Sequence, residues 1–245
     1  MRTAWNATRT LFGFTVIVLY TIAVCSWLMV VTRFRPGTRH TEVLARGWGR
    51  LFNFFAGVDN TIVGLENVDR RASYVFVSNH LSNLDAPYHL ATMPVGVRFL
   101  AKKELFKVPL FGPTLRAVGM IETDRQAHAA AHREINRRVA KVIAMKRSLL
   151  IYPEGTRSRD AELHPFKKGA FRIAVENEMP VLPVTIAGTD KVWRPGEKWW
   201  RGGKVKMVFH PPIPTAGLGE AGIDAVREQA HRIIGDCYRQ IRGEV

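Results

Sequence analysis

The N-terminal part of the chain carries its longest apolar segment. The stretch from Leu11 to Thr32 contains 22 residues and no charged side chain. As a helix it spans about 33 Å, roughly the thickness of the hydrocarbon core of a bilayer. A cleaved signal peptide is disfavoured, because the apolar run is too long and residues 31–35 offer no small-residue cleavage site. The pattern predicts a retained membrane anchor.

Basic residues flank this segment unequally. Arg2 and Arg9 precede it, whereas five arginines follow it between residues 33 and 50. Positive charge collects on the cytoplasmic side of membrane proteins. We therefore expect the rest of the chain to lie on the cytoplasmic face of the cell inner membrane.

The stretch after the anchor has the pattern of an amphipathic helix. Apolar residues recur at helical spacing, and polar residues lie off that stripe. The stripe comprises Leu44, Trp48, Leu51, Phe52 and Phe55, with Arg46, Arg50 and Asn53 beside it. Two interpretations stay open: the stripe lies in the membrane interface next to a spanning or re-entrant first helix, or it packs on the globular domain. The sequence thus predicts a membrane-anchoring helix or two-helix motif over residues 1–58.

From residue 59 onward, short β-rich runs alternate with helical patterns. The predicted strands are Thr61–Leu65, Tyr74–Ser78, Arg98–Ala101, Met120–Glu122, Leu149–Tyr152, Val181–Ile186 and Lys204–Phe209. The predicted helices are Asp85–Thr92, Phe111–Ala117, Ala127–Lys146, Lys168–Glu176 and Ile223–Arg242. This alternation predicts an α/β domain over residues 59–245, with a mixed, largely parallel sheet flanked by helices. Ligands of such sheets usually sit beyond the carboxyl ends of the strands.

The charge balance narrows the class of partner. A formal charge of +15 and a pI near 10.4 favour a polyanion, which includes nucleic acid, an anionic bilayer and phosphorylated metabolites. The basic residues are dispersed and no nucleic-acid-binding motif is present, so we expect no nucleic-acid partner. Cys25 and Cys237 lie far apart and predict neither a disulfide framework nor a metal site.

A histidine and an aspartate lie where one predicted strand ends. The strand Tyr74–Ser78 runs into Asn79 and His80, and Asp85 follows five residues later. This spacing suits a histidine at a strand end and an aspartate at the start of the next helix. A neutral imidazole can accept a proton near pH 7, and a carboxylate fixes its tautomer and stabilises the imidazolium. For an isolated pair, the alternative is an exposed histidine beside a helix-capping aspartate.

A second polar run follows the predicted strand Leu149–Tyr152. Its residues 153–159 read Pro-Glu-Gly-Thr-Arg-Ser-Arg. Gly155 permits close backbone approach, Thr156 offers a hydroxyl, and the planar guanidinium of Arg157 suits a phosphate. By itself, this run predicts an anion site.

Together these runs resemble the glycerolipid acyltransferase family. The family's first motif, Asn-His-four residues-Asp, falls on Asn79, His80 and Asp85, and its third, Glu-Gly-Thr-Arg-Ser, falls on residues 154–158. The weaker second and fourth motifs are similar to residues 119–125 and 181–186, and the run 99–105 also looks like the family. The resemblance covers about residues 60–215.

The resemblance implies acyl transfer without a cofactor or a metal. A fatty acyl group moves from acyl-CoA or acyl carrier protein to the free sn-2 hydroxyl of lysophosphatidic acid, which gives phosphatidic acid in phospholipid biosynthesis. His80 acts as general base and Asp85 orients it, which is a contribution of roughly 10²–10⁴ to the rate. Backbone amides near Gly155 are candidates for stabilising the oxyanion.

The resemblance also implies a set of substrate-binding residues around the phosphate of the acceptor. They are Asn79, Lys102, Arg125, Glu154, Gly155, Thr156 and Arg157. The expected partners are a lysophospholipid acceptor, the acyl donor and an anionic membrane surface.

Other readings of the same residues stay open. The chemistry could act on another acceptor, such as lyso-ornithine lipid or glycerol-3-phosphate. A different class is a membrane-anchored protein that binds nucleic acid or anionic lipid without catalysis. A serine hydrolase is disfavoured, because the sequence has no Gly-x-Ser-x-Gly elbow.

A loop at residues 193–201 gathers three tryptophans and three basic residues. Aromatic and basic side chains together suit a lipid headgroup interface. The alternative is an ordinary surface loop with partly buried tryptophans.

Overall fold

The computed structural model describes residues 2–34, 40–123 and 129–245. The helices are α1 (Arg2–Phe34), α2 (His40–Ala56), α3 (Asp85–Thr92), α4 (Phe111–Ala117), α5 (Ala129–Ala144), α6 (Gly169–Glu176), α7 (Thr189–Val192) and α8 (Ile223–Ile241). The strands are β1 (Val58–Val63), β2 (Val75–Ser78), β3 (Val97–Lys102), β4 (Ile121–Thr123), β5 (Ser148–Ile151), β6 (Val181–Ala187) and β7 (Gly203–Phe209). Each predicted strand and helix has a counterpart, and the short α7 is the helix that the sequence patterns did not predict.

All seven strands form one sheet in the order β1-β7-β6-β2-β5-β3-β4. Strand β2 lies in its centre, where Val75 pairs with Leu149 of β5 and Val181 of β6, both in parallel. The pair β6–β7 is antiparallel, and β1 joins β7 in parallel. The predicted mixed, largely parallel sheet is therefore confirmed. The carboxyl ends of β2, β5 and β3 meet at one edge, which positions the loops that follow them.

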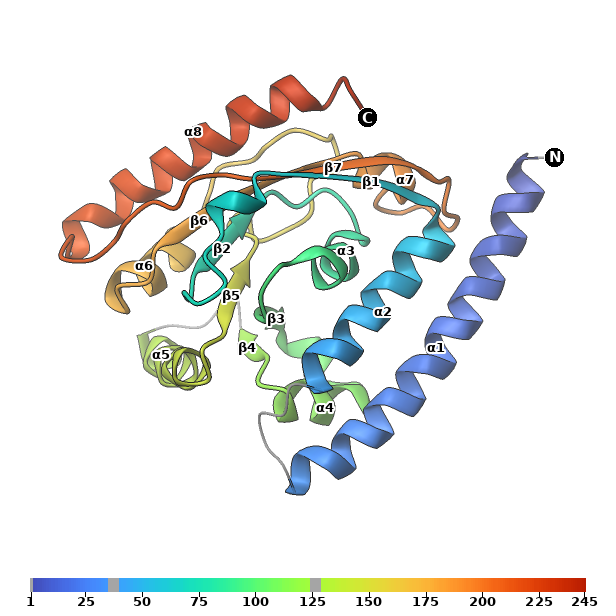
Figure 1. The fold of residues 1–245 in the computed structure, drawn as a ribbon, viewed down its shortest axis with the longest axis horizontal. Coiled ribbons are helices and arrows are strands. Elements are labelled where there is room, and N and C mark those ends of the chain that lie inside the picture. Colours follow the sequence, from blue (N-terminus) through green and yellow to red (C-terminus); the bar gives the residue numbers. More distant parts are fainter. Residues whose placement is uncertain (1, 35–39, 124–128) are drawn as a thin grey trace.

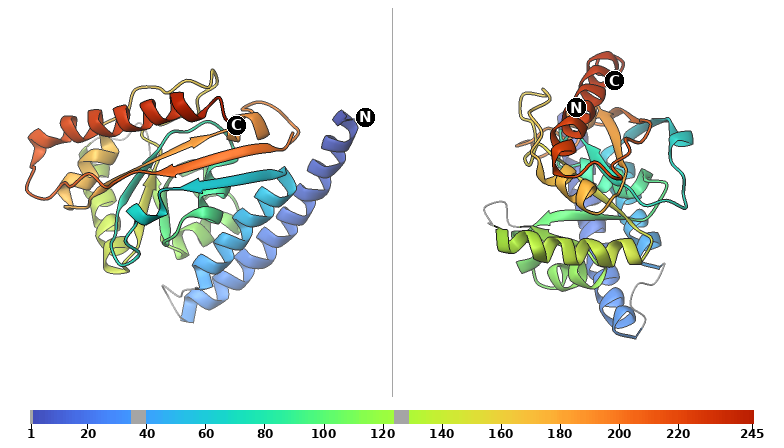
Figure 2. Two further views of the ribbon diagram at one scale, coloured as in Figure 1. Left: turned by 45° about the horizontal axis from the view of Figure 1, so that its top comes forward. Right: turned by 90° about the vertical axis from the view of Figure 1, so that its left-hand side faces the viewer.

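The two faces of the sheet carry separate apolar clusters, because successive side chains of a strand point to opposite sides. In β2, Phe76 faces the cluster under α2 and α3, whereas Val75 and Val77 face the cluster under α5, α6 and the first part of α8. Figure 1 shows the resulting layers, with the sheet between the two sets of helices, and Figure 2 shows the same arrangement from two other sides. Burial on both faces explains why the central strands read as continuous apolar runs.

Helix α2 packs directly on α3. A Cβ at Gly49 would lie 2.3 Å from the carbonyl oxygen of Pro87, so only glycine allows the helices to approach this closely. Phe52 is buried in the core, and Trp48, Leu51 and Phe55 pack against it. Of the two interpretations of the amphipathic stripe, the structure supports packing on the globular domain.

Helix α1 lies alongside α2 and touches the globular domain near both of its ends (Figure 1). Near the N-terminus, Arg9 donates to the carbonyl oxygen of Trp200 at 3.0 Å, and the amide of Trp200 donates to Thr10. Near the other end, the hydroxyl of Thr114 in α4 lies 3.5 Å from the carbonyl oxygen of Cys25. The helix is long and apolar enough to cross a membrane, and most of its side chains are not buried.

The tryptophan-containing loop at residues 193–201 packs against these two N-terminal helices. Trp200 is fully buried and stacks on Phe14 of α1, with ring centroids 4.7 Å apart. Trp193 packs edge-on against the same Phe14. These two tryptophans therefore serve packing between the loop and the helices.

Candidate active site

His80 and Asp85 meet in the loop between β2 and α3. The chain leaves β2 at Ser78, and α3 begins at Asp85. The imidazole Nδ1 lies 2.6 Å from the carboxylate oxygen Oδ2 of Asp85. The same oxygen accepts the backbone amides of Leu81 at 2.7 Å and Ser82 at 2.8 Å. The loop thus folds back on the first residue of α3, as the spacing of five residues predicts.

The surroundings of the pair fix the tautomer of His80. The carboxylate of Asp85 is fully buried and can only accept, so Nδ1 carries the hydrogen of this bond. The imidazole of His80 remains 15% exposed, and its Nε2 keeps a lone pair. A neutral imidazole with this lone pair can accept a proton from a bound hydroxyl, and the buried carboxylate then stabilises the imidazolium.

Glu154 braces the backbone of His80. Its Oε1 accepts the amide of His80 at 2.7 Å, and its Oε2 accepts the amide of His164 at 3.0 Å. The amide of Ser158 in turn donates to the carbonyl oxygen of His80 at 2.8 Å. Burial raises the pKa of Glu154 to about 7, although the hydrogen bonds from the amides of His80 and His164 favour its charged form. The loop after β5 therefore clamps the histidine from both sides.

Asn79 ties the same loop to β6. Its side chain is fully buried, and it exchanges two hydrogen bonds with Ile186, at 2.8 Å and 2.9 Å. In this structure the polar atoms of Asn79 and Glu154 are engaged by the protein itself. That either residue contacts a substrate stays a prediction.

The loop at residues 155–157 is partly exposed to solvent beside the pair of His80 and Asp85. Gly155 has φ +75°, and a Cβ there would lie 2.9 Å from the Nζ of Lys167. Thr156 and Arg157 are exposed and line a surface hollow. Among the residues that the structure describes, neither Arg157 nor Lys167 has a side-chain hydrogen bond or an ion pair. Asp160 also lines the hollow, but its carboxylate is bonded to Ser158 and His164, so Arg157 remains available to an anion.

Two further cationic residues, Lys102 and Arg125, were predicted to lie at the phosphate site. Lys102 is the exposed last residue of β3, at the same edge of the sheet as His80 and Glu154. Arg125 lies outside the described residues, two positions after the end of β4.

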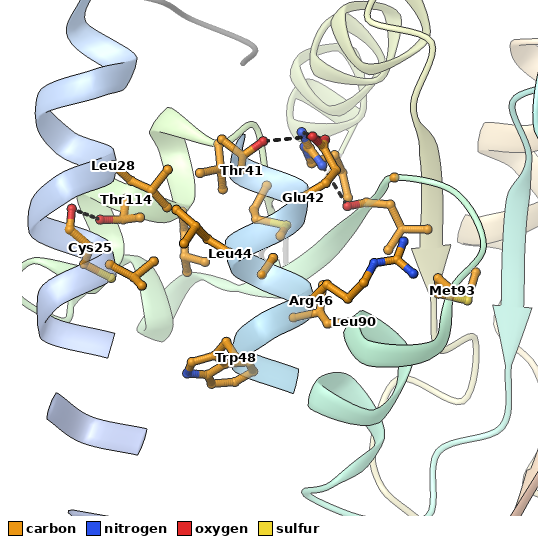
Figure 3. Close-up of a pocket in the computed structure, with 18 of the residues that line it drawn as sticks. Cys25, Leu28, Thr41, Glu42, Leu44, Arg46, Trp48, Leu90, Met93 and Thr114 are labelled. Atoms are coloured by element: carbon orange, nitrogen blue, oxygen red, sulfur yellow. Dashed lines mark hydrogen bonds and ion pairs between the residues drawn. The ribbon is translucent and has the colours of Figure 1, made fainter. Parts of the chain in front are cut away.

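An apolar pocket of about 110 Å³ lies between the N-terminal helices and the globular domain. Figure 3 shows Cys25 and Leu28 of α1, Leu44 and Trp48 of α2, and Leu90 of α3 around it. One corner is polar, because Glu42 accepts from Arg98 at 2.8 Å and from Arg147 at 2.7 Å. Pockets of this kind hold apolar ligands with a few polar groups that fix their orientation.

The sequence patterns missed three residues close to the pair. Tyr152 follows β5, and its ring stacks on the imidazole of His80. His89 lies fully buried one helical turn after Asp85. Lys167 folds over Gly155. The spacing between Asp85 and His89 was a usable signal, since residues four apart share a helix face, whereas the contacts of Tyr152 and Lys167 arise only in three dimensions.

Comparison with known proteins places these residues within a family. The family model Acyltransferase matches residues 59–187, which include His80, Asp85 and the loop at residues 154–157. A 1-acyl-sn-glycerol-3-phosphate acyltransferase of Limnanthes douglasii is 33% identical over 223 residues, which cover 89% of this chain and 77% of the relative. A protein of the same name from Saccharomyces cerevisiae is 30% identical over 92% of this chain and 77% of its own length.

A solved structure is similar along nearly the whole chain. It is the 1-acyl-sn-glycerophosphate (LPA) acyltransferase PlsC from Thermotoga maritima, with a TM-score of 0.82 and 25% identity. The match covers 99% of this chain and 98% of that one, so it includes the N-terminal helices. The chain belongs to the acyltransferase family and is an acyltransferase of phospholipid biosynthesis.

Proposed function

We propose that this enzyme is a 1-acylglycerol-3-phosphate O-acyltransferase, which transfers a fatty acyl group to the sn-2 hydroxyl of lysophosphatidic acid and gives phosphatidic acid. The observation that carries the proposal is the 2.6 Å bond between His80 and Asp85 beside a loop of unpaired cations. One part of this arrangement suits a hydroxyl nucleophile, and the other suits a phosphate on the same molecule. The relatives at about 30% identity bear the name of this activity.

The proposed reaction needs one base and no covalent enzyme intermediate. The Nε2 of His80 takes the proton of the sn-2 hydroxyl while the oxygen attacks the thioester carbonyl of acyl-CoA or acyl carrier protein. Asp85 stays ionised and stabilises the imidazolium. The tetrahedral intermediate then collapses, the C–S bond breaks, and the imidazolium returns the proton to the thiolate. Backbone amides near Gly155 are the proposed donors to the oxyanion.

The phosphate of the acceptor is proposed to bind in the hollow beside Gly155. Arg157 offers two parallel N–H donors, Thr156 a hydroxyl, and Lys167 a point charge. Lys102, at the end of β3, and Arg125, which lies outside the described residues, are proposed to add charge. Lys168 provides a matched control for Lys167, because its ammonium is already paired with Asp224 at 2.8 Å.

The N-terminal helices are proposed to anchor the enzyme in a single leaflet of the cell inner membrane, on its cytoplasmic face. Thr10 and Cys25 lie about 22 Å apart along α1, and both contact the globular domain. A helix docked at both ends on one domain cannot cross the bilayer without immersing that domain. The outer face of α1 is apolar and exposed, for example at Phe12, Leu19 and Val30. Residues 1–58 thus form the proposed anchor and residues 59–245 the proposed catalytic domain.

Accessibility of the two termini tests this placement. Epitope tags at either end of the chain should both react with antibody on the cytoplasmic side of inverted membrane vesicles. Protection of one tag and exposure of the other would show that α1 spans the bilayer.

A panel of acceptors tests the proposed activity. Purified enzyme in mixed micelles is offered acyl-CoA or acyl carrier protein with lysophosphatidic acid, lyso-ornithine lipid, glycerol-3-phosphate or a monoacylglycerol. Mass spectrometry identifies the product, and heat-denatured enzyme is the blank. We expect phosphatidic acid as the main product. Efficient acylation of another acceptor, with lysophosphatidic acid left unused, would contradict the proposal.

A further inference from the structure

The half-buried Tyr152 and the buried His89 make a second set of contacts with the pair of His80 and Asp85. The ring of Tyr152 stacks on the imidazole of His80, with centroids 4.0 Å apart and planes inclined by 12°. The hydroxyl of Tyr152 lies 3.1 Å from Nδ1 of His89. The same Nδ1 lies 2.7 Å from the backbone carbonyl oxygen of Asp85. The contacts therefore run from His80 through Tyr152 and His89 back to Asp85.

His89 is neutral in this cluster. Its side chain is fully buried, and burial lowers its pKa to about 4. A carbonyl oxygen can only accept, so Nδ1 of His89 carries a hydrogen and points it at Asp85 and Tyr152. In a neutral ring whose Nδ1 carries the hydrogen, Nε2 is unprotonated, and it has no hydrogen-bond partner among the described residues. His89 thus holds the tyrosine hydroxyl without adding charge near the base.

The bond to Asp85 alone leaves the plane of the His80 imidazole undetermined. It fixes the position of Nδ1, but the ring can still rock about the line from Nδ1 to the carboxylate. Such rocking displaces Nε2, the atom that must meet the hydroxyl of the acceptor. A flat aromatic face at 4.0 Å opposes this motion, because tilting the imidazole would press it into the ring of Tyr152.

We propose that Tyr152 is a positioning residue, which sets the plane of the His80 imidazole while His89 holds its hydroxyl. The inference rests on the proposed function of His80 as general base. Displacing a reacting group by about 1 Å can cost roughly a hundredfold in rate. Loss of the aromatic face should therefore act on turnover, whereas loss of the hydroxyl alone should act weakly.

Four variants test the inference: Tyr152→Leu, which removes the ring; Tyr152→Phe, which keeps it; Phe99→Leu, a control; and His80→Ala, a reference. Phe99 is a suitable control because it is buried beside Tyr152, with ring centroids 6.3 Å apart, and makes no ring contact with His80. Steady-state kinetics with lysophosphatidic acid give kcat and KM separately. We expect Tyr152→Leu to lower kcat by about thirtyfold with KM within about twofold. Tyr152→Phe and Phe99→Leu should keep kcat within about threefold of the wild type.

The kinetic outcomes separate the two proposals. If His80→Ala is inactive while Tyr152→Leu turns over like the wild type, the positioning role is wrong and the proposed base stands. If His80→Ala transfers acyl groups at the wild-type rate, the proposed base itself is wrong. An equally large loss in Tyr152→Phe or Phe99→Leu would also overturn the positioning role, because neither change removes the ring that faces His80.

A spectroscopic measurement keeps the inference testable should Tyr152→Leu fail to fold. In wild-type enzyme with labelled histidine, the ring C–H signals of His80, assigned with His80→Ala, should be shifted upfield by the stacked ring. The shift should persist in Tyr152→Phe and Phe99→Leu. A His80 signal at the position of an unstacked histidine in the folded wild type would overturn the inference.

Discussion

The two halves of the candidate site differ in whether their charged side chains already have partners within the protein. On one side, Asp85 is buried and accepts three hydrogen bonds through a single oxygen, and Glu154 and Ser158 clamp the backbone of His80. On the other side, Arg157 lines an open hollow and Lys167 lies over Gly155, and neither has an ion-pair partner among the described residues.

On the proposed function, this contrast separates chemistry from recognition. The buried half is preorganised, so the proposed transfer of a proton to His80 needs no reorganisation of the protein. The open half keeps its cations hydrated until a ligand supplies the negative charge. Changes in the first half should therefore lower kcat, and changes in the second should raise the KM of the acceptor.

Apart from replacement of His80 itself, the largest effect is expected from Asp85→Asn. The amide keeps the size of the carboxylate and its oxygen can still accept the three hydrogen bonds, but it lacks the negative charge that stabilises the imidazolium of His80. We expect kcat to fall by about a thousandfold with little change in the KM of lysophosphatidic acid. Circular dichroism serves as the control for folding. A variant that keeps full kcat would show that the buried half is not the chemical half.

A smaller effect, on stability, is expected from the buried His89. Its folded pKa of about 4 lies below the ordinary value of 6.5, so between these values the unfolded chain binds a proton that the folded chain does not. Stability from this group is therefore complete above pH 6.5 and is lost as the pH falls toward 4. Between pH 6.5 and 5 the loss should amount to about 2 kcal/mol.

His89→Asn isolates this contribution, since its amide can still donate to the carbonyl of Asp85 but does not titrate. The difference in free energy of unfolding between wild type and variant should shrink as the pH is lowered through this window. Glu154 changes stability in the opposite direction, because its raised pKa makes its contribution fall as the pH rises from 4.5 to about 7, and it is common to both proteins. Parallel pH curves for the two proteins would contradict the neutral state of His89.

In the open half, Arg157→Ala should raise the KM of lysophosphatidic acid by about tenfold, which corresponds to one lost charge-assisted interaction. The kcat at saturation should change little. A monoacylglycerol, which lacks the phosphate, provides the control substrate, and its kinetics should be the same in both proteins. An unchanged KM for lysophosphatidic acid would remove Arg157 from the phosphate site.

The smallest measurable effect in this comparison is expected from Lys167→Met. We expect the KM of lysophosphatidic acid to rise about threefold to fivefold, because a single hydrated ammonium is lost from an open site. Lys168→Met, the paired neighbour, should leave KM unchanged. Equal effects of both changes would point to the overall charge of the protein in place of a specific contact.

The sequence predicted more of the fold than of the site. The strands were predictable because apolar runs such as Leu149–Tyr152 have few alternatives to a buried strand. The ends of α1 were not, since hydropathy marks the apolar centre at residues 11–32 while the helix extends from Arg2 to Phe34. The packing of α2 was left open, because an apolar stripe does not tell a lipid from a protein surface; Gly49 against α3 decides it.

Within the site, short-range contacts were predictable and long-range ones were not. The spacing of His80 and Asp85 predicted their bond, because both lie in one loop. The amides that Glu154 reaches lie 74 residues before it and 10 after it, and no local pattern specifies them. The sequence motif assigned Glu154 to the phosphate, whereas its carboxylate braces the histidine in this structure. Arg125 lies outside the described residues, so its role stays a prediction.

The central claim is that His80 is the base for the hydroxyl of the acceptor. The most direct test measures the formation of phosphatidic acid from lysophosphatidic acid and acyl-CoA by His80→Ala, in vesicles to which the variant binds as tightly as the wild type. We predict that the rate falls by about a thousandfold or more while vesicle binding and the melting temperature are unchanged. Transfer by His80→Ala at a rate near that of the wild type would contradict the account.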